Sequence, residues 1–223
     1  MEKGSPERKR AKLNLPNRLT VLRLVTVPFC VAAAVMPESV MPGWLSALIA
    51  LVLFIAASVT DALDGHIARK YSLITDLGKF LDPLADKFLV IGVMLAAVYR
   101  YDAIRPWFFW VVFTVIFREL AVTSLRLVAV SSGSRKVIAA GWTGKIKTVC
   151  QMICICAVLG EPLICRLMPE GGFAAFIAGY RPLTLLFSAL TVIFTLLSAV
   201  IYFKRYGGFL LGSGSDGEEK KDG

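Results

Sequence analysis

Residues 43–60, GWLSALIALVLFIAASVT, form an 18-residue stretch without a charged side chain. A transmembrane helix needs about 20 mainly apolar residues, because the hydrocarbon core of a bilayer is about 30 Å thick. The stretch is continuously apolar rather than alternating, which argues against a strand of an outer-membrane barrel. It therefore predicts a membrane-spanning helix.

Similar apolar stretches recur along the whole chain of 223 residues. Six are long enough to span a membrane, with bounds near 20–36, 43–60, 84–99, 106–130, 144–167 and 183–203. Hydrophobic residues make up 57% of the chain and charged residues 18%, and a soluble domain of this size exposes too much surface to carry that composition. We therefore expect an all-α polytopic membrane protein with six transmembrane helices. Its expected organisation is a basic tail and amphipathic entry segment (1–18), a membrane domain (19–206) and a disordered tail (207–223).

The net charge of +9 is distributed unevenly along the chain. Eighteen lysines and arginines lie in the N-terminal tail, the second-to-third connection, the fourth-to-fifth connection and the C-terminal region, against four in the other connections. Cytoplasmic connections of membrane proteins are enriched in these residues, so we expect both termini in the cytoplasm. The charge then marks topology and contacts with anionic lipid headgroups, and we expect no nucleic-acid partner.

The connection between the second and third stretches, residues 61–86, has the sequence DALDGHIARKYSLITDLGKFLDPLAD. Asp61 and Asp64 are three residues apart and share a helix face, as do Asp82 and Asp86, which are four apart. Two pairs of like charge at a membrane boundary are costly unless a cation compensates them. Carboxylates without nearby thiolates or imidazoles favour Mg²⁺ or Mn²⁺, so the sequence predicts a metal site here.

Alternatives to this interpretation remain open in the sequence. The acids can instead be solvated, or they can pair with Arg69, Lys79 and Lys87. His66 is the only histidine, and it lies off the face of the first acidic pair, so we expect no ligand or base role for it.

The start of the third helix is also open. Pro83 fits the first turn of a helix capped by Asp82, whereas it kinks a helix that begins near Thr75. Asp82 and Asp86 face the same way in either case.

Basic residues occur on two later stretches. Arg118 and Arg126 are eight residues apart, close to two helical turns, and therefore lie on similar faces. An arginine at membrane depth normally faces a cavity or a partner, and Glu119 is an alternative partner for either. Lys145 and Lys147 begin the fifth stretch. If these cations converge near the aspartates, the site suits phosphoryl chemistry between a metal-bound diphosphate and a second phosphorylated substrate.

The spaced residues of the 61–86 connection resemble the signature of one enzyme family. The pattern is Asp61-x2-Asp64-Gly65-x2-Ala68-Arg69-x8-Gly78-x3-Asp82-x3-Asp86. It is similar, without a departure, to the signature of the CDP-alcohol phosphotransferases. Other segments resemble the bacterial members that make phosphatidylglycerophosphate, namely Asn14-Leu15-Pro16-Asn17-x2-Thr20-x2-Arg23, Arg118-Glu119, Ser124-Leu125-Arg126 and Gly144-Lys145-Ile146-Lys147-Thr148-x2-Gln151. The resemblance thus covers residues 13–151.

This resemblance implies a fold, a reaction and a location. The fold is six transmembrane helices around a cytoplasm-facing polar cavity, commonly as a homodimer, in the inner membrane of a bacterium. The reaction is transfer of a phosphatidyl group from CDP-diacylglycerol to glycerol 3-phosphate, with release of CMP. The implied cofactors are two divalent cations, Mg²⁺ or Mn²⁺.

The resemblance also implies roles for individual residues. The metal ligands would be Asp61, Asp64, Asp82 and Asp86, with Asp86 also the general base. The contacts to CDP-diacylglycerol would come from Gly65, Ala68, Arg69, Thr75 and Gly78. The acceptor phosphate would be held by Arg118, Arg126, Lys145 and Lys147. The border of the nucleotide site would include Asn17, Thr20 and Arg23, for which a purely structural role is equally compatible with the sequence.

Two other kinds of function compete with this interpretation. A sibling enzyme would use another acceptor, such as phosphatidylglycerol in cardiolipin synthesis, inositol phosphate or serine, but the GKIKT segment and the paired arginines favour glycerol phosphate. A cation transporter would place acidic residues near mid-bilayer, with an internal repeat or a pair of broken helices. The acids here cluster at one face and no repeat is visible, which favours the enzyme.

Overall fold

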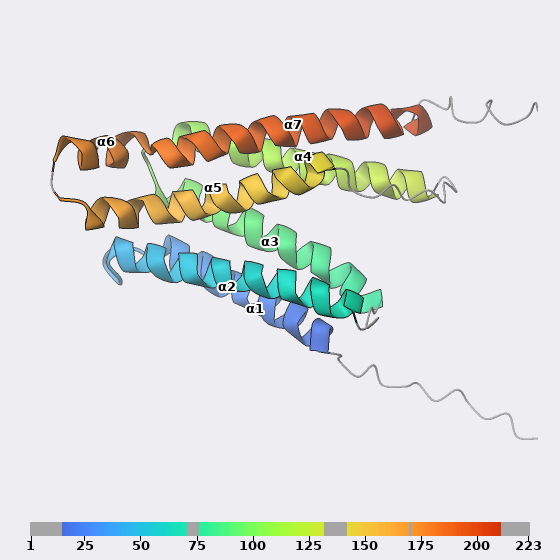
Figure 1. Cartoon of the computed structure of the whole chain (residues 1–223), viewed down its shortest axis with the longest axis horizontal. Coiled ribbons are helices and arrows are strands. Elements are labelled where there is room, and N and C mark those ends of the chain that lie inside the picture. Colours follow the sequence, from blue (N-terminus) through green and yellow to red (C-terminus); the bar gives the residue numbers. More distant parts are fainter. Residues whose placement is uncertain (1–14, 71–75, 132–141, 170, 211–223) are drawn as a thin grey trace, which may run out of the picture.

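The structure is a computed structural model, and it describes residues 15–70, 76–131, 142–169 and 171–210. These residues form seven α-helices and no strand (Figure 1). The helices are α1 (Leu15–Val35), α2 (Gly43–Lys70), α3 (Asp76–Arg100), α4 (Arg105–Ser131), α5 (Trp142–Leu167), α6 (Gly172–Tyr180) and α7 (Pro182–Leu210).

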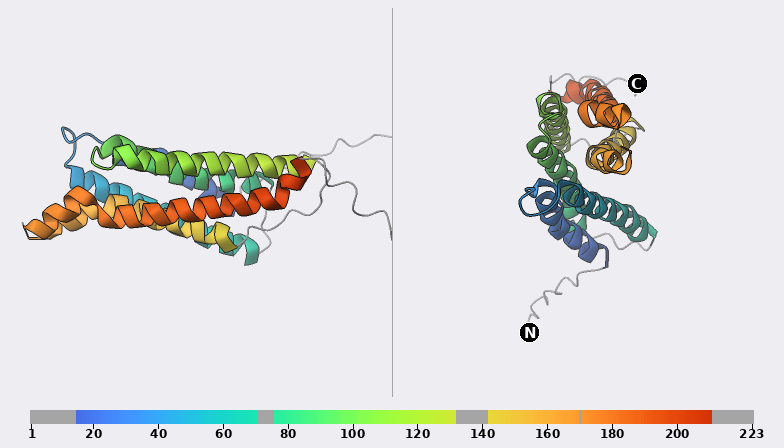
Figure 2. Two further views of the ribbon diagram at one scale, coloured as in Figure 1. Left: turned by 90° about the horizontal axis from the view of Figure 1, so that it is seen from above. Right: turned by 90° about the vertical axis from the view of Figure 1, so that its left-hand side faces the viewer.

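The long helices run along one common axis, so the chain passes repeatedly between the two ends of the bundle (Figures 1 and 2). The start of α1 and the end of α7 lie at the same end, which we call the terminal end (Figure 1). The opposite end, which carries α6, is called the hairpin end. Helix α1 packs against α2 and α3, α7 packs against α4 and α5, and α5 joins the two groups through its contacts with α2 and α3.

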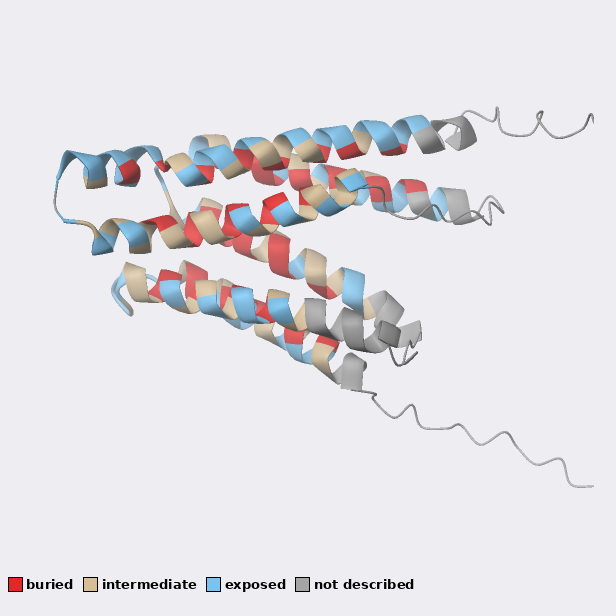
Figure 3. Ribbon diagram, viewed as in Figure 1, coloured by how far each residue is buried: buried red, intermediate tan, exposed pale blue. Residues whose placement is uncertain are grey.

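The outer surface of the bundle is largely apolar, as expected of a protein in a membrane. Within the described ranges, four segments are long and apolar enough to cross a membrane, Gly43–Asp61, Arg105–Leu125, Trp142–Leu167 and Gly172–Lys204. A shorter apolar segment, Leu19–Val35, lies in α1. Large apolar side chains such as Phe29, Trp110 and Leu196 are exposed, and exposed and buried residues alternate along each long helix (Figure 3). The chain is therefore an all-α polytopic membrane protein.

The number of transmembrane helices, which the sequence predicts to be six, stays a prediction. Helix α3 is not one of the four long apolar segments, and its N-terminal half carries Asp82, Asp86 and Lys87. These charges belong to the connection that the sequence marks as a site. The expected tails at 1–18 and 207–223 lie largely outside the described residues.

The structure adds one helix that the sequence analysis did not predict and decides where the third helix begins. Helix α6 was not predicted, because it is apolar, has only nine residues and lies between two longer apolar stretches. Helix α3 begins at Asp76, so Pro83 lies inside it, and the alternative of a helix capped by Asp82 is wrong. Thr75 lies outside the described residues.

The core combines large and small side chains. Phe54, Leu89, Phe108 and Ile155 are at most 2% exposed and fill the centre of the bundle. Helices α1 and α3 approach closely at Gly92, where an added Cβ would lie 3.0 Å from Cγ2 of Val31. Because lipid tails are as apolar as the core, such close packing is the main source of helix association in a membrane.

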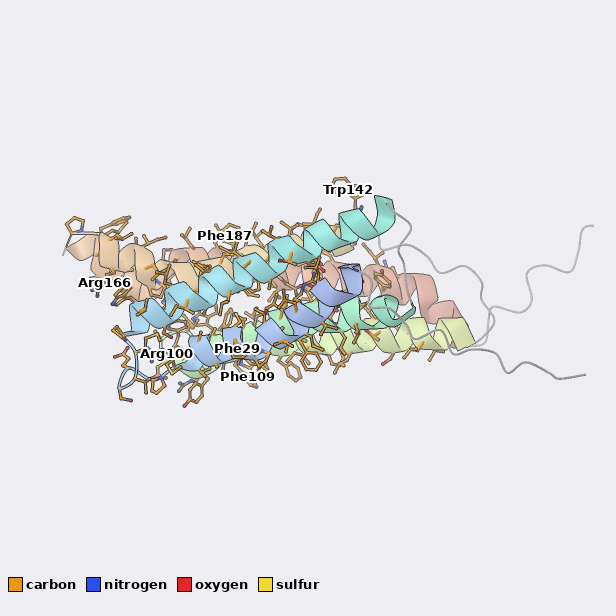
Figure 4. The ribbon with its side chains drawn as sticks, turned by 90° about the horizontal axis from the view of Figure 1, so that it is seen from below. Phe29, Arg100, Phe109, Trp142, Arg166 and Phe187 are labelled. Carbon is orange, nitrogen blue, oxygen red and sulfur yellow. The ribbon has the colours of Figure 1, made fainter. Side chains whose placement is uncertain are left out.

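A closed polar cluster joins α5, α6 and α7 at the hairpin end. Glu161 is fully buried, and its carboxylate accepts hydrogen bonds from the Leu183 amide at 2.7 Å and from Thr184 Oγ1 at 2.5 Å. Arg181, which has a left-handed backbone with φ 49°, donates to the carbonyl of Val158 at 3.0 Å. Arg100 and Arg166 also lie at this end, away from Trp142 (Figure 4).

Candidate active site

One face of α1 contacts both helices of the acidic connection. The guanidinium of Arg23 forms an ion pair with Asp61 of α2. One turn earlier, Thr20 Oγ1 donates a hydrogen bond to Asp82 Oδ1 of α3 at 2.5 Å. Both α1 residues are almost completely buried, at 1% and 2% exposure. Asp61 of α2 and Asp82 of α3 therefore both lie against the same side of α1.

Asp86 lies one helical turn beyond Asp82, between this acidic cluster and a group of basic residues. It is half-buried, and its charge interacts with those of Asp61, Arg23, Lys147 and Glu119. It also lines a cavity in the part of the bundle near the terminal end. A carboxylate in this place can reach groups bound on either side.

The cavity has a volume of about 160 Å³ and lies among α3, α4, α5 and α7. Its charged and polar lining comes from Asp86, Lys87, Arg118, Glu119, Lys147, Thr148, Gln151 and Tyr202. Its apolar lining includes Val90, Ile91 and Val115. Four helices that are distant in sequence thus contribute polar groups to one small space.

Glu119 is the central residue of the basic group. Its Oε1 accepts a hydrogen bond from Arg118 Nη1 at 3.0 Å and also binds Lys147 Nζ. The ammonium of Lys87 lies 3.9 Å from Glu119 Oε2. Three cations surround one carboxylate, so the cluster keeps a net positive charge, and it suits an anion such as a phosphate.

Other contacts hold these cations in place. Arg118 Nη2 donates to Ser198 Oγ at 2.5 Å, and the same guanidinium lies 5.5 Å from the ring centroid of Tyr202. Lys87 Nζ donates to Thr123 Oγ1 at 2.7 Å. The basic groups are thus preorganised by the protein.

The predicted acceptor-phosphate residues have different positions. Arg118 and Lys147 are buried and line the cavity, whereas Lys145 is exposed and is not part of the lining. Arg126 belongs to α4, but its side chain is outside the described set. Lys145 and Lys147 are two residues apart on a helix and therefore point to different sides of α5.

Several predicted residues cannot be placed by their side chains. Asp64, Gly65, Ala68 and Arg69 belong to α2, Gly78 to α3 and Asn17 to α1, but their side chains lie outside the described residues. Among the side chains that are described, no group of three His, Cys, Asp or Glu lies close enough together to hold a metal ion. The predicted ligand set includes Asp64, so the metal site stays a prediction.

The donor chemistry of the described residues fits a hard divalent cation. Asp61, Asp82 and Asp86 offer only oxygen ligands, which is the preference of Mg²⁺ and Mn²⁺. Asp61 already faces a positive group in the form of Arg23. The type of donor therefore fits the predicted cations, whose site stays a prediction.

Sequence reasoning missed Ser198 and Tyr202 and gave Glu119 only as an alternative arginine partner. A signal for Ser198 exists in α7, where buried hydroxyl residues recur at alternating intervals of four and three. They are Thr184, Ser188, Thr191, Thr195 and Ser198, all at most 2% exposed. Such spacing marks one buried helix face, which here packs on α4 and α5.

Comparison with known proteins supports the resemblance. The family model of the CDP-alcohol phosphatidyltransferases matches residues 13–197. The CDP-diacylglycerol–glycerol-3-phosphate 3-phosphatidyltransferase of Bacillus subtilis (strain 168) is 37% identical over 204 residues, which are 86% of this chain and 94% of the relative. The enzyme of the same name from Escherichia coli (strain K12) is 35% identical over 156 residues, 69% of this chain and 80% of the relative. The chain belongs to the CDP-alcohol phosphatidyltransferase family.

Proposed function

We propose that this protein transfers a phosphatidyl group from CDP-diacylglycerol to glycerol 3-phosphate, giving phosphatidylglycerophosphate and CMP. The names of the similar proteins support both substrates. The structural observation that carries the proposal is the position of Asp86 between the acidic cluster and a positively charged cavity. One site can then bind a diphosphate on one side and a phosphorylated acceptor on the other.

The donor half of the site consists of the carboxylates of α2 and α3. Asp61, Asp64, Asp82 and Asp86 would hold two divalent cations, and the nucleotide would contact Gly65, Ala68, Arg69, Thr75 and Gly78. When bound, the cations would neutralise the diphosphate and stabilise the CMP leaving group. Thr20 and Arg23 hold Asp82 and Asp61 on the α1 side, which orients the two carboxylates before a substrate binds.

The acceptor half is the basic cavity. Arg118 and Lys147 bind the phosphate of glycerol 3-phosphate, because both are buried cations on its wall. In the absence of that phosphate they share Glu119 as their counter-ion. Glu119 thereby keeps two buried cations paired until an anion arrives, which limits the cost of burying them.

Asp86 acts as the general base. It takes the proton from the free primary hydroxyl of glycerol 3-phosphate, whose oxygen forms a bond to the phosphorus that carries the diacylglycerol. The bond between that phosphorus and the bridging oxygen breaks, and the electron pair leaves with CMP. Asp86 shares the cavity wall with Lys147, so the attacking hydroxyl and the acceptor phosphate can be held together.

The proposal includes an orientation in the membrane. The cavity lies toward the terminal end, and the connections at this end carry most of the lysines and arginines. We therefore place the terminal end at the cytoplasmic side of a bacterial inner membrane, where glycerol 3-phosphate can enter the site and CMP can leave it. The acyl chains can then stay in the bilayer, and assembly as a homodimer is a further part of the proposal.

A CMP-release assay tests this function. The purified protein in detergent micelles is given CDP-diacylglycerol and Mg²⁺ or Mn²⁺, with glycerol 3-phosphate, inositol phosphate, serine or phosphatidylglycerol as separate acceptors. We expect CMP with glycerol 3-phosphate and a loss of CMP release when a chelator removes the metal. Faster release with another acceptor would identify a sibling enzyme. Metal flux into liposomes without CMP release from any acceptor would contradict the enzyme altogether.

A further inference from the structure

Gln151 is a buried polar residue of the cavity wall that the proposed reaction does not yet use. It belongs to α5, is 3% exposed, and lines the cavity together with Lys147. Its Nε2 is buried and has no hydrogen-bond partner among the described residues. A buried amide N–H without a partner is uncommon and costly in proteins. We therefore expect the hydrogen-bond acceptor for Gln151 Nε2 to belong to a bound ligand.

The neighbours of Gln151 indicate which kind of hydrogen-bond acceptor its Nε2 can bind. It follows Lys147 by four residues, so the two side chains lie on the same face of α5. Lys147 and Arg118 bind Glu119, and Lys87 binds Thr123. Each of these cations therefore has a side-chain partner, although Arg118 Nε is itself without one among the described residues. Gln151 is the uncharged side chain of the cavity wall whose buried donor has no described partner. A neutral donor beside a phosphate-binding cation suits an uncharged oxygen of the same ligand.

We propose that Gln151 selects the acceptor by donating a hydrogen bond from Nε2 to the middle hydroxyl of glycerol 3-phosphate. This inference rests on the proposed function. Glycerol 3-phosphate carries a phosphate, a primary hydroxyl and a secondary hydroxyl between them. Arg118 and Lys147 bind the phosphate and Asp86 receives the proton of the primary hydroxyl, which leaves the secondary hydroxyl for Gln151. A hydroxyl oxygen accepts hydrogen bonds as well as donating one.

The cavity places Gln151 on the same wall as Arg118 and Lys147, the two cations that bind the proposed phosphate. A site built to hydrogen-bond a substrate hydroxyl discriminates strongly against an analogue without it, because the protein donor then stays unpaired. Gln151 therefore provides discrimination as well as affinity.

The test compares two acceptors and three proteins. The acceptors are glycerol 3-phosphate and 3-hydroxypropyl phosphate, which keeps the phosphate and the primary hydroxyl but lacks the secondary one. For the wild type we expect kcat/KM, from CMP release, to be at least about tenfold higher with glycerol 3-phosphate. For Gln151→Met, which conserves the volume, we expect kcat/KM to fall at least about tenfold with glycerol 3-phosphate and to change little with the analogue.

Thr195→Val is the matched control. Thr195 Oγ1 is also buried without a partner within the described ranges, but Thr195 does not line the cavity. The control should keep the wild-type ratio between the two acceptors. The KM for CDP-diacylglycerol should be unchanged in both variants, and thermal unfolding in detergent reports whether each variant is folded.

Each outcome distinguishes this inference from the proposed function. A wild type that uses both acceptors equally well contradicts the role of Gln151, even if Gln151→Met does not fold. An equal loss with both acceptors in Gln151→Met assigns the residue to the structure or to the phosphate, which also overturns the inference. A wild type that releases CMP with another acceptor but not with glycerol 3-phosphate contradicts the proposed function instead.

Discussion

Two glutamates, the half-buried Glu119 and the fully buried Glu161, lie toward opposite ends of the bundle and are stabilised in different ways. Glu161 is fully buried, and its oxygens accept hydrogen bonds from the Leu183 amide and from the amide and hydroxyl of Thr184. Glu119 lines a cavity, and its partners are the side chains of Arg118 and Lys147, with Lys87 nearby. One carboxylate is bound at the start of a helix, the other by long cationic side chains.

Under the proposed function, this difference separates a structural carboxylate, Glu161, from a carboxylate of the acceptor site, Glu119. The backbone amides at the start of α7 cannot leave Glu161 without unwinding the helix, and they favour a negative charge. Arg118 also contacts Ser198 and Tyr202, so it has partners besides Glu119 when it binds the proposed phosphate. The type of partner therefore indicates which of the two carboxylates has partners that a ligand can share.

The largest expected effect concerns Asp86, the acid that lies beside the Glu119 cluster and has no counterpart in the Glu161 cluster. Asp86→Asn keeps the shape of the side chain but cannot accept a proton from the acceptor hydroxyl. We expect kcat to fall by about 10²–10⁴-fold, the usual contribution of a general base, while thermal unfolding in detergent changes little. CMP release measures the loss, and near-normal turnover would remove Asp86 from the base role.

A second prediction compares the two glutamates directly by replacing each with its neutral isostere. Glu119→Gln removes the carboxylate that forms ion pairs with the two buried cations Arg118 and Lys147, which costs about 3 kcal/mol of unfolding free energy. Glu161→Gln loses the charge at the helix start and part of its hydrogen bonding, at about 1–2 kcal/mol. Thermal unfolding in detergent with and without glycerol 3-phosphate measures both.

Ligand should distinguish the two variants. Glycerol 3-phosphate supplies an anion to Arg118 and Lys147, so it should raise the melting temperature of Glu119→Gln more than that of the wild type. The melting temperature of Glu161→Gln should rise only as much as the wild type's. If glycerol 3-phosphate raised the melting temperatures of both variants equally, or of neither, the two clusters would not differ in their access to the ligand.

The smallest expected effect concerns two lysines of α5. Lys147→Met removes a buried cation of the cavity, and we expect the KM for glycerol 3-phosphate to rise at least about tenfold, in the range of a lost charged hydrogen bond. Lys145→Met removes an exposed cation outside the lining, and its KM should rise about threefold at most. The KM for CDP-diacylglycerol serves as the internal control. A larger effect of Lys145 would move the acceptor phosphate away from the cavity.

Helical periodicity accounts for most of what was predictable. Asp82 and Asp86 share a face because they are four residues apart, and this holds wherever the helix begins. The apolar stretches predicted helices whose positions the structure confirms, since about 20 apolar residues have few alternatives to a membrane helix. Helix α6 escaped prediction because nine apolar residues beside a longer apolar stretch carry no boundary signal of their own.

Contacts between distant helices were not predictable in the same way. Arg23 and Asp61 are 38 residues apart and Thr20 and Asp82 are 62 apart. From the sequence, a structural role and a place at the border of the nucleotide site were equally compatible with Thr20 and Arg23. The sequence offered no reason to prefer Lys145 or Lys147 as a phosphate ligand. The packing of α5 buries Lys147 and leaves Lys145 exposed.

The sequence by itself determined the helical membrane class, the family and the faces on which the aspartates lie, because each depends on local spacing or on a continuous motif. Only the tertiary structure decided that Glu119 holds two cations, that Lys147 rather than Lys145 lines the cavity, and that Gln151 keeps a free donor there. These properties depend on how α3, α4, α5 and α7 pack together. The period of a single helix contains no information about the side chains of the next.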